Sequence, residues 1–345
     1  TIVIGEKPNR PQKGKIILNK QGEVVASVTE QDGRDTPGYA ESGLEGAEFT
    51  VQAAEDIYTP DGTLRYAKGE MVETLVTSAD GTAESKELYL GKYEIVETKA
   101  PYGMVKSDEN LTEELVYAGQ EIAVTSTSVS LYNERQKVEV KLYKDLEKDE
   151  LFQIGMGDEI LNIYFALYAK EELTAADGSM IPADGLIEIA GVQADGTLTF
   201  TADLPIGSYY VKEYAVDEQY LISEEIYPVT FSYDDETVSV VKIEIKNGEA
   251  ILNKIIRGSI TGVKVNEASE PLPGTVFGLF RADCIEFTEE NAILTAASAE
   301  DGSFAFENVP YGVWLVREIA AGEGYVLSDE LFEVQVSEGG AVIEL

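Results

Sequence analysis

The sequence of 345 residues contains one cysteine and no histidine. With Cys284 alone, no intrachain disulfide can form, so the usual covalent staple of small extracellular domains is excluded. The lack of histidine removes the commonest metal ligand and the commonest general base. We therefore expect no metal, no cofactor and no nucleophilic catalysis that depends on histidine.

Basic residues are also scarce, with 26 Lys and Arg against 64 Asp and Glu, for a net charge of -38. Phosphate binding needs the opposite sign, which argues against nucleic acid and acidic membranes as partners. No apolar run reaches the length of about 20 residues that crosses a bilayer, so no membrane insertion is expected. No signal peptide is recognisable at Thr1. We expect a soluble, monomeric segment of a longer protein.

A threefold repeat is the main positive feature. In each copy a glycine is followed six residues later by a glutamate, with an aromatic and an aliphatic residue between them at positions of the same parity. The copies are Gly91 to Glu97, Gly207 to Glu213 and Gly312 to Glu318. Because side chains alternate between the faces of a strand, each glutamate shares a face with these apolar residues and points into a core. A carboxylate there is costly unless it is neutralised, paired or used.

The repeat has the length of a small domain. Each copy also contains a tight Asp-Gly turn, at Asp80-Gly81, Asp195-Gly196 and Asp301-Gly302. Alternating Val, Ile, Tyr, Phe and Thr predict strands, and long helical periodicity is absent. We predict an all-β chain of three tandem β-sandwiches in an elongated rod, because the linkers are short. The predicted division is a linker over 1–11, then domain 1 over 12–136, domain 2 over 137–256 and domain 3 over 257–345.

Each copy opens with a strand that ends in a lysine on the core-facing parity, namely Lys20, Lys144 and Lys264. Asn133 and Asn253 end later strands of the first two copies, again on the core-facing parity. Burial disfavours the ammonium ion and the carboxylate, which leaves a nucleophilic amine beside a carboxylic acid. Such an acid can polarise the asparagine carboxamide and shuttle protons as ammonia leaves. The predicted product is a Lys–Asn isopeptide bond.

Two other interpretations of the lysines stay open. A lysine at a strand end often extends its amine to water, so a neighbouring glutamate would form an ordinary ion pair. Lys15 and Lys141 are nearby competitors; Lys15 has outward parity, and Lys141 is the weaker alternative in domain 2.

The stretch Val96-Glu97-Thr98-Lys99-Ala100-Pro101-Tyr102-Gly103 is close to an E-T-K-A-P-x-G-Y motif. With Tyr132-Asn133-Glu134-Arg135, it resembles the CnaB or SpaA-type (prealbumin-like) domains of Gram-positive surface proteins and pilins. The resemblance implies a sandwich of about seven strands, in which a lysine of the first strand bonds an asparagine of the last and a glutamate promotes the reaction. Transferred by position, the sets are Lys20, Glu97 and Asn133 in domain 1, and Lys144, Glu213 and Asn253 in domain 2.

All three copies depart from this pattern in places, and in domain 1 Lys20 is followed by Gln21-Gly22 and not by the family's hydrophobic residue and aspartate. In domain 2, Glu213 is followed by Tyr214-Ala215 and not by the T-K-A-P continuation. Domain 3 has Lys264 and Glu318, but no asparagine follows Glu318. We therefore expect a truncated final strand, an idle Glu318 and no cross-link in domain 3.

These features together predict a structural role. We expect a stalk segment of a cell-wall-anchored adhesin or pilin-like protein, located on the surface of a Gram-positive bacterium and flanked by other domains of the same parent protein. Its chemistry would be a single-turnover self-modification and not an enzyme activity. The alternative is an adhesin module that binds a host glycoprotein or glycan through loops or exposed tyrosines. A hydrolase with paired carboxylates is disfavoured, because no second inward carboxylate recurs near the glutamates.

Overall fold

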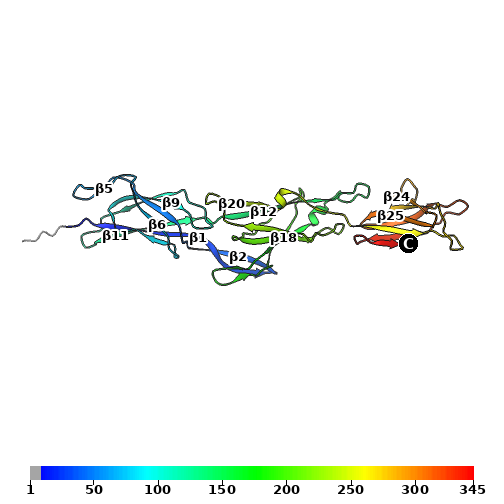
Figure 1. Cartoon of the computed structure of the whole chain (residues 1–345), viewed down its shortest axis with the longest axis horizontal. Coiled ribbons are helices and arrows are strands. Elements are labelled where there is room, and N and C mark those ends of the chain that lie inside the picture. Colours follow the sequence, from blue (N-terminus) through cyan, green and yellow to red (C-terminus); the bar gives the residue numbers. More distant parts are fainter. Residues whose placement is uncertain (1–8) are drawn as a thin grey trace, which may run out of the picture.

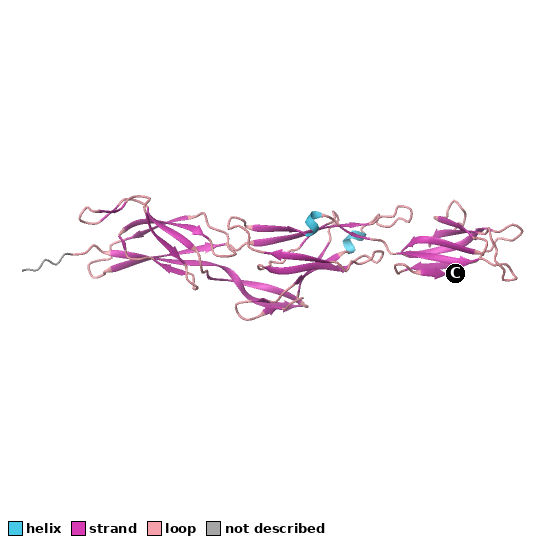
Figure 2. Cartoon of the chain, viewed as in Figure 1, coloured by secondary structure: helices cyan, strands magenta, loops and turns pink. Residues whose placement is uncertain are grey.

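The computed structural model describes residues 9–345, which form strands and two short 3-10 helices; most of the predicted N-terminal linker, residues 1–8, lies outside this range. Three β-sandwiches follow one another along an elongated molecule (Figure 1), and nearly all regular structure is strand (Figure 2). The prediction of an all-β tandem rod is therefore confirmed. Among the described residues, no helix has the length and apolar character that a membrane span requires.

Domain 1 is built from two facing sheets. In the first, β1 (Lys13–Gln31) lies between β11 (Val124–Asn133), which is parallel to it, and β2 (Arg34–Gly43), and also pairs with β7 (Thr82–Glu84) and β8 (Leu88–Tyr89). The second has the order β10 (Asn110–Leu115), β9 (Gly91–Lys99), β3 (Glu48–Ala53) and β6 (Met71–Val76). A separate hairpin joins β4 (Ile57–Tyr58) to β5 (Leu64–Tyr66). The apolar faces of the two sheets form the core, with Phe49 and Tyr93 fully buried.

Domain 2 repeats this plan. Its first sheet centres on β12 (Lys137–Leu146), which pairs with β17 (Thr197–Thr199), β20 (Val240–Glu244) and β21 (Ile251–Asn253). The second has the order β16 (Leu186–Gly191), β13 (Tyr164–Ala169), β18 (Gly207–Ala215) and β19 (Ile226–Phe231). The smaller elements are β14 (Leu173–Thr174), β15 (Met180–Ile181) and the 3-10 helices η1 (Glu159–Asn162) and η2 (Ile245–Gly248). The second helix, η2, interrupts the last strand between β20 and β21.

Domain 3 has the same two layers. One sheet has the order β25 (Ser303–Pro310), β22 (Arg257–Val263) and β28 (Val342–Glu344). The other has the order β24 (Leu294–Ala297), β23 (Val276–Arg281), β26 (Gly312–Ala320) and β27 (Leu331–Val336). In every domain the strand that runs from the repeated glycine to the glutamate is central in the second sheet. This position explains why Tyr93, Tyr209 and Trp314 are buried.

The first hairpin extends beyond its own sandwich. We call residues 23–41 the arm; it consists of the far ends of β1 and β2 and lies beneath domain 2 (Figure 1). Two hydrogen bonds join the arm to domain 2. Ala176 N of domain 2 donates to Val25 O of the arm (3.0 Å), and Val28 N of the arm donates to Ser179 Oγ of domain 2 (2.7 Å). The arm therefore adds backbone contacts to the junction between domains 1 and 2.

Arg135 closes the junction between domains 1 and 2. Its guanidinium lies over the Tyr39 ring of the arm, 3.7 Å from the ring centroid. It also pairs with Glu23 of the arm at 3.2 Å and with Asp203 of domain 2. One buried cation thus contacts both partners of the junction. At the next junction Arg257 has a comparable place, because it pairs with Asp149 at 2.9 Å and with Glu147 at 3.0 Å.

Candidate functional site

Lys20, Glu97 and Asn133 meet between the sheets of domain 1. Their relative exposures are 0%, 1% and 1%. Lys20 Nζ lies 3.2 Å from Glu97 Oε1, and Asn133 Nδ2 donates a hydrogen bond to Glu97 Oε2 at 2.9 Å. The carboxyl group therefore lies between the amine and the carboxamide, with one oxygen toward each.

Domain 2 contains the same arrangement. Lys144 Nζ lies 3.8 Å from Glu213 Oε1, and Asn253 Nδ2 donates to Glu213 Oε2 at 2.9 Å. The three side chains are again buried. In addition, Lys144 Nζ donates to Ile251 O at 2.6 Å, which turns the amine toward the last strand. Two independent sandwiches thus bring together the residue types that the sequence predicts.

The pairing of the first and last strands explains why the lysine and the asparagine lie close together. The first and last strands of each domain are parallel neighbours, and each asparagine lies opposite the residue two positions beyond the lysine. The paired residues are Gly22 with Asn133 in domain 1 and Leu146 with Asn253 in domain 2. Because side chains alternate with a period of two, a lysine and the residue two positions on share a face. The lysine and the asparagine therefore emerge on the same face of adjacent strands.

Burial changes the charge balance of the lysines. It lowers the pKa of the Lys20 amine, although the charge of Glu97 acts in the opposite direction. In domain 2 burial lowers the pKa of Lys144 to about 8, against a smaller opposing effect of Glu213. A lowered amine pKa increases the neutral fraction, and the neutral amine is the nucleophile.

Several buried polar atoms at these two sites make no hydrogen bond. Within residues 9–345, the buried side-chain atoms without a hydrogen bond include Lys20 Nζ, Glu97 Oε1, Asn133 Oδ1, Glu213 Oε1 and Asn253 Oδ1. A buried group left unsatisfied costs roughly 1–3 kcal/mol. In each domain these atoms cluster around one lysine, one acid and one amide, so the ion pair and the hydrogen bonds of the site leave part of its polar groups unsatisfied.

Domain 3 differs. Lys264 Nζ contacts Glu318 Oε2 at 2.9 Å, but a quarter of the lysine side chain is exposed. A hollow of about 220 Å³ lies beside the pair and is lined by Phe277, Phe332 and other residues. The structure thus brings Lys264 and Glu318 together as an ion pair open to solvent. The competitors are elsewhere: Lys15 pairs with Glu84 at the surface, and Lys141 lies over the Tyr143 ring.

Each Asp-Gly turn packs on the backbone of the lysine, a role that the sequence did not suggest. The lysine N–H donates to the turn glycine O in all three domains, and the pairs are Lys20 with Gly81 (2.7 Å), Lys144 with Gly196 (2.7 Å) and Lys264 with Gly302 (2.8 Å). Gly81 has φ +80°, and a Cβ added there would lie 2.3 Å from Lys20 O. The glycine is therefore required both by its φ and by this close approach.

We predict that Gly81→Ala strongly destabilises domain 1. The substitution adds a contact far shorter than van der Waals distance to the roughly 1–2 kcal/mol cost of a left-handed conformation. Gly62→Ala is the matched control, because Gly62 has the same φ of +80° and nothing lies within 4 Å of its added Cβ. In thermal unfolding, Gly81→Ala should cost at least about twice as much free energy as Gly62→Ala. Equal losses would contradict a steric role for the turn.

Two serines that were not predicted also contact the glutamates through their backbone N–H groups. Ser107 N donates to Glu97 Oε2, and Ser223 N donates to Glu213 Oε2, each at 2.7 Å. Each serine follows its glutamate by ten residues, and Ser328 follows Glu318 by the same interval. A comparison of the three copies shows this spacing, and it could have identified the serines from the sequence alone.

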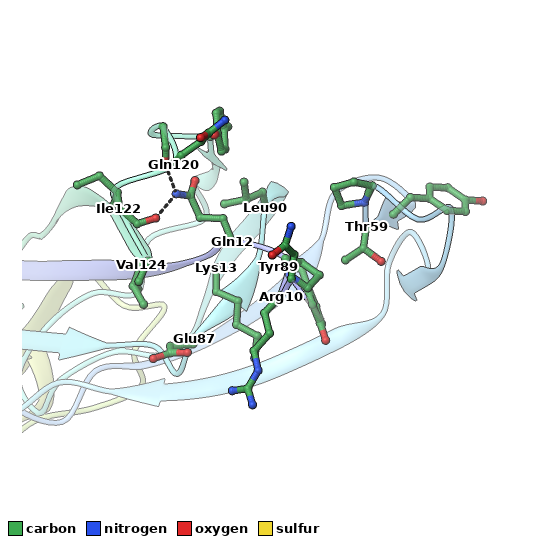
Figure 3. Close-up of a pocket in the computed structure, with 17 residues that line it drawn as sticks. Arg10, Gln12, Lys13, Thr59, Glu87, Tyr89, Leu90, Gln120, Ile122 and Val124 are labelled. Carbon is green, nitrogen blue, oxygen red and sulfur yellow. Dashed lines mark hydrogen bonds between the residues drawn. The ribbon is translucent and has the colours of Figure 1, made fainter. Parts of the chain in front are cut away.

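A second, wider hollow lies elsewhere, at the N-terminal end of domain 1 (Figure 3). It has a volume of about 1230 Å³, and its lining includes Tyr58, Tyr89 and Tyr117 as well as Arg10 and Lys13. Tyr58 and Tyr117 are 56% and 62% exposed. The hollow is separate from the buried lysines and is therefore a candidate for ligand contact and not for isopeptide chemistry.

Solved structures with a similar fold come from Gram-positive bacteria. The Bacillus anthracis TIE protein is 22% identical, with a TM-score of 0.66 over 96% of this chain and 50% of that one, so this chain spans about half its length. The Bacillus cereus major pilin subunit BcpA is 16% identical, with a TM-score of 0.38 over 97% and 98% of the two chains. The Corynebacterium diphtheriae major pilin SpaD is 16% identical, with a TM-score of 0.25 over 97% and 96%.

The comparison with curated proteins finds no match. The family model for the SpaA prealbumin-like fold domain, in contrast, matches three times, over residues 37–129, 156–248 and 258–345. One match falls in each sandwich, and together they cover most of the sequence. The resemblance first seen in the Glu97 motif is confirmed: this chain belongs to the SpaA prealbumin-like domain family, with three of its domains in tandem.

Proposed function

We propose that this chain is a force-bearing stalk segment of a Gram-positive surface adhesin or pilin-like protein, stiffened by isopeptide bonds from Lys20 to Asn133 and from Lys144 to Asn253. One observation carries the proposal: two separate sandwiches bury a lysine, a glutamate and an asparagine in the same strand register. Membership of the SpaA prealbumin-like family supports a structural role at the cell surface. Its partners would then be neighbouring domains of the parent protein.

The geometry accounts for the atoms of the reaction. Lys20 Nζ attacks Asn133 Cγ, the Cγ–Nδ2 bond breaks, and nitrogen leaves as ammonia. One proton must leave Nζ and one must arrive on Nδ2. Glu97 faces the first nitrogen with Oε1 (3.2 Å) and the second with Oε2 (2.9 Å). A carboxyl group that spans both nitrogens can serve as acid and base within one turnover.

The placement of the bonds suits a load-bearing role. Each bond joins the strand that enters a sandwich to the strand that leaves it. Tension on the chain ends would pass from one strand to the other through an amide, and the intervening residues would carry none. An amide is also indifferent to reductants, which fits a chain with a single cysteine. In domain 3 we propose no bond, with Glu318 idle.

Intact mass spectrometry under denaturing conditions tests the proposal. We expect the wild-type mass to fall short of the sequence mass by two molecules of ammonia. Fragment analysis should then place the two branched peptides at Lys20–Asn133 and Lys144–Asn253. A full sequence mass would reject the bonds, and a third loss of ammonia would contradict our account of domain 3.

The second candidate function is recognition of a host glycoprotein or glycan. The hollow at the end of domain 1 supports it, because exposed Tyr58 and Tyr117 stand beside basic side chains in an otherwise acidic protein. Aromatic faces and polar groups together are typical of such sites. Binding to immobilised glycans and matrix glycoproteins that is lost in Tyr117→Ala, but kept in Tyr164→Ala of domain 2, would favour this function.

A further inference from the structure

We propose that two short segments, residues 105–107 in domain 1 and 221–223 in domain 2, position the reacting groups for isopeptide formation. We call them the positioning loops. The inference rests on the function proposed above and adds a part that neither the lysine, the glutamate nor the asparagine supplies. Each loop begins eight residues after the promoting glutamate. Each also makes the same three kinds of hydrogen bond to the site.

The first bond fastens the loop to the last strand. Val105 N donates to Glu134 O at 2.8 Å, and Leu221 N donates to Lys254 O at 2.9 Å. In both domains the acceptor belongs to the residue that follows the reactive asparagine. The loop therefore moves with the strand end that presents the carboxamide.

The second bond holds the nitrogen that will leave. Asn133 Nδ2 donates to Val105 O, and Asn253 Nδ2 donates to Leu221 O at 2.7 Å. The third holds the acid, because the serine N–H two residues later donates to the glutamate Oε2 at 2.7 Å in both domains. One loop thus contacts the leaving nitrogen through a carbonyl and the acid through an N–H.

These contacts determine which carboxyl oxygen faces which nitrogen. Glu97 Oε2 accepts from both Ser107 N and Asn133 Nδ2, so Oε1 is left to face Lys20 Nζ. Without the Ser107 N–H, the carboxyl group could rotate about its Cγ–Cδ bond, and the bridging orientation would become one of several. Reaction rates depend steeply on such orientation.

Domain 3 shows the arrangement without an asparagine-bearing strand. Ser328 again follows Glu318 by ten residues and lines the same hollow, but Glu318 Oε2 is engaged by Lys264 Nζ. Val326, at the place of Val105 and Leu221, is 92% exposed. In domains 1 and 2, where the loop is hydrogen-bonded to the last strand, the acid lies between the lysine and the asparagine. In the described part of domain 3, the acid contacts only the lysine.

The test is the pair Ser107→Pro and Ser107→Ala. Proline has no N–H, whereas alanine keeps the N–H and removes only the hydroxyl group, which accepts from Glu109 N. Ammonia loss is followed by mass spectrometry after a pulse of cell-free synthesis. Ser107→Pro should slow bond formation in domain 1 by about 100-fold, the order expected when reacting groups lose their orientation. Ser107→Ala should stay near the wild-type rate, and domain 2 should be unchanged in both.

Damage to the fold is measured separately. In a Glu97→Gln background no bond is expected to form, so the effect of Ser107→Pro on the melting temperature there reports folding alone. If proline unfolds domain 1, an α-hydroxy acid at position 107 deletes the N–H while keeping the side chain. Bond formation at the wild-type rate in the proline or the ester variant would overturn the positioning role. A wild-type protein with no ammonia loss would reject the proposed function itself.

Discussion

Replacing Glu97 and Glu213 together by glutamine is expected to abolish both ammonia losses and to lower the thermal stability of domains 1 and 2 sharply. Glutamine keeps the size of glutamate but cannot exchange a proton between the two nitrogens. The lost bonds close loops of 113 (133 − 20) and 109 (253 − 144) residues. By analogy with disulfides, each would stabilise its domain by about 4 to 5 kcal/mol.

That loss is large for a domain of this size. A change of 1 kcal/mol shifts the melting temperature of a small domain by roughly 4 °C or more, so we expect a decrease of about 15–20 °C in each domain. Differential scanning calorimetry and limited proteolysis measure it. Glu318→Gln is the matched control, because it changes the same strand position in a domain without the asparagine; it should leave the mass deficit and the stability of domains 1 and 2 unaltered. An unchanged deficit in the double variant would show that the glutamates are dispensable.

Stretching single molecules from their ends should give the second large effect. In the wild-type chain, residues 20–133 and 144–253 lie behind covalent bridges, so only domain 3 should unfold with a large extension. Glu97→Gln should add one unfolding event of about 40 nm, since 113 residues extend by at most ~3.3–3.6 Å each. Glu213→Gln should add a separate event of nearly the same length.

Counting the large unfolding events in each variant tests this prediction directly. Two added events are expected in the double variant, one in each single variant and none in Glu318→Gln. Large events from all three domains of the wild-type chain would show that the proposed bridges do not carry the load, even if some ammonia is lost.

Much of the fold and of the site could be predicted because side chains alternate between the two faces of a strand. Glu97 shares parity with Tyr93 and Ile95, and all three are buried on one face of β9. Lys20 likewise follows Ile16 and Leu18 on the buried face of β1. Alternation is a local property, so a single sequence displays it. The threefold recurrence then argued against an accidental placement of the glutamates.

The arm could not be predicted in this way. From Glu23 to Val28, β1 is half-buried at every position, so the alternation that marks the rest of the strand stops. Both faces of the strand are partly covered there. Some of this cover comes from residues about 150 positions away in the sequence, such as Ser179. No local pattern records such a contact. The register shift in the arm, between Val25 and Ser27, is equally silent in the sequence.

The positioning loops were missed for another reason. Their contacts to the site use the Val105 carbonyl, which every residue can supply, and the Ser107 N–H, which every residue except proline can supply. Side-chain identity therefore carries little of the signal, and only the interval from the glutamate remains. For Gly81 the Asp-Gly pair predicted a tight turn, but the sequence did not reveal the carbonyl of Lys20 against which the turn packs.

The arm has a practical consequence for dividing the molecule. Domain 2 produced alone would lose the strand that meets Ala176 and Ser179, and domain 1 produced alone would expose a hairpin with an uncovered face. Arg135 would lose either Asp203 or both Glu23 and Tyr39, depending on the side of the cut. Recombinant fragments that respect the repeat boundaries would thus separate surfaces that fold against each other. The pair of domains 1 and 2 is the smallest unit that keeps the arm covered, and removing domain 3 would leave the arm in place while separating Arg257 from Glu147 and Asp149.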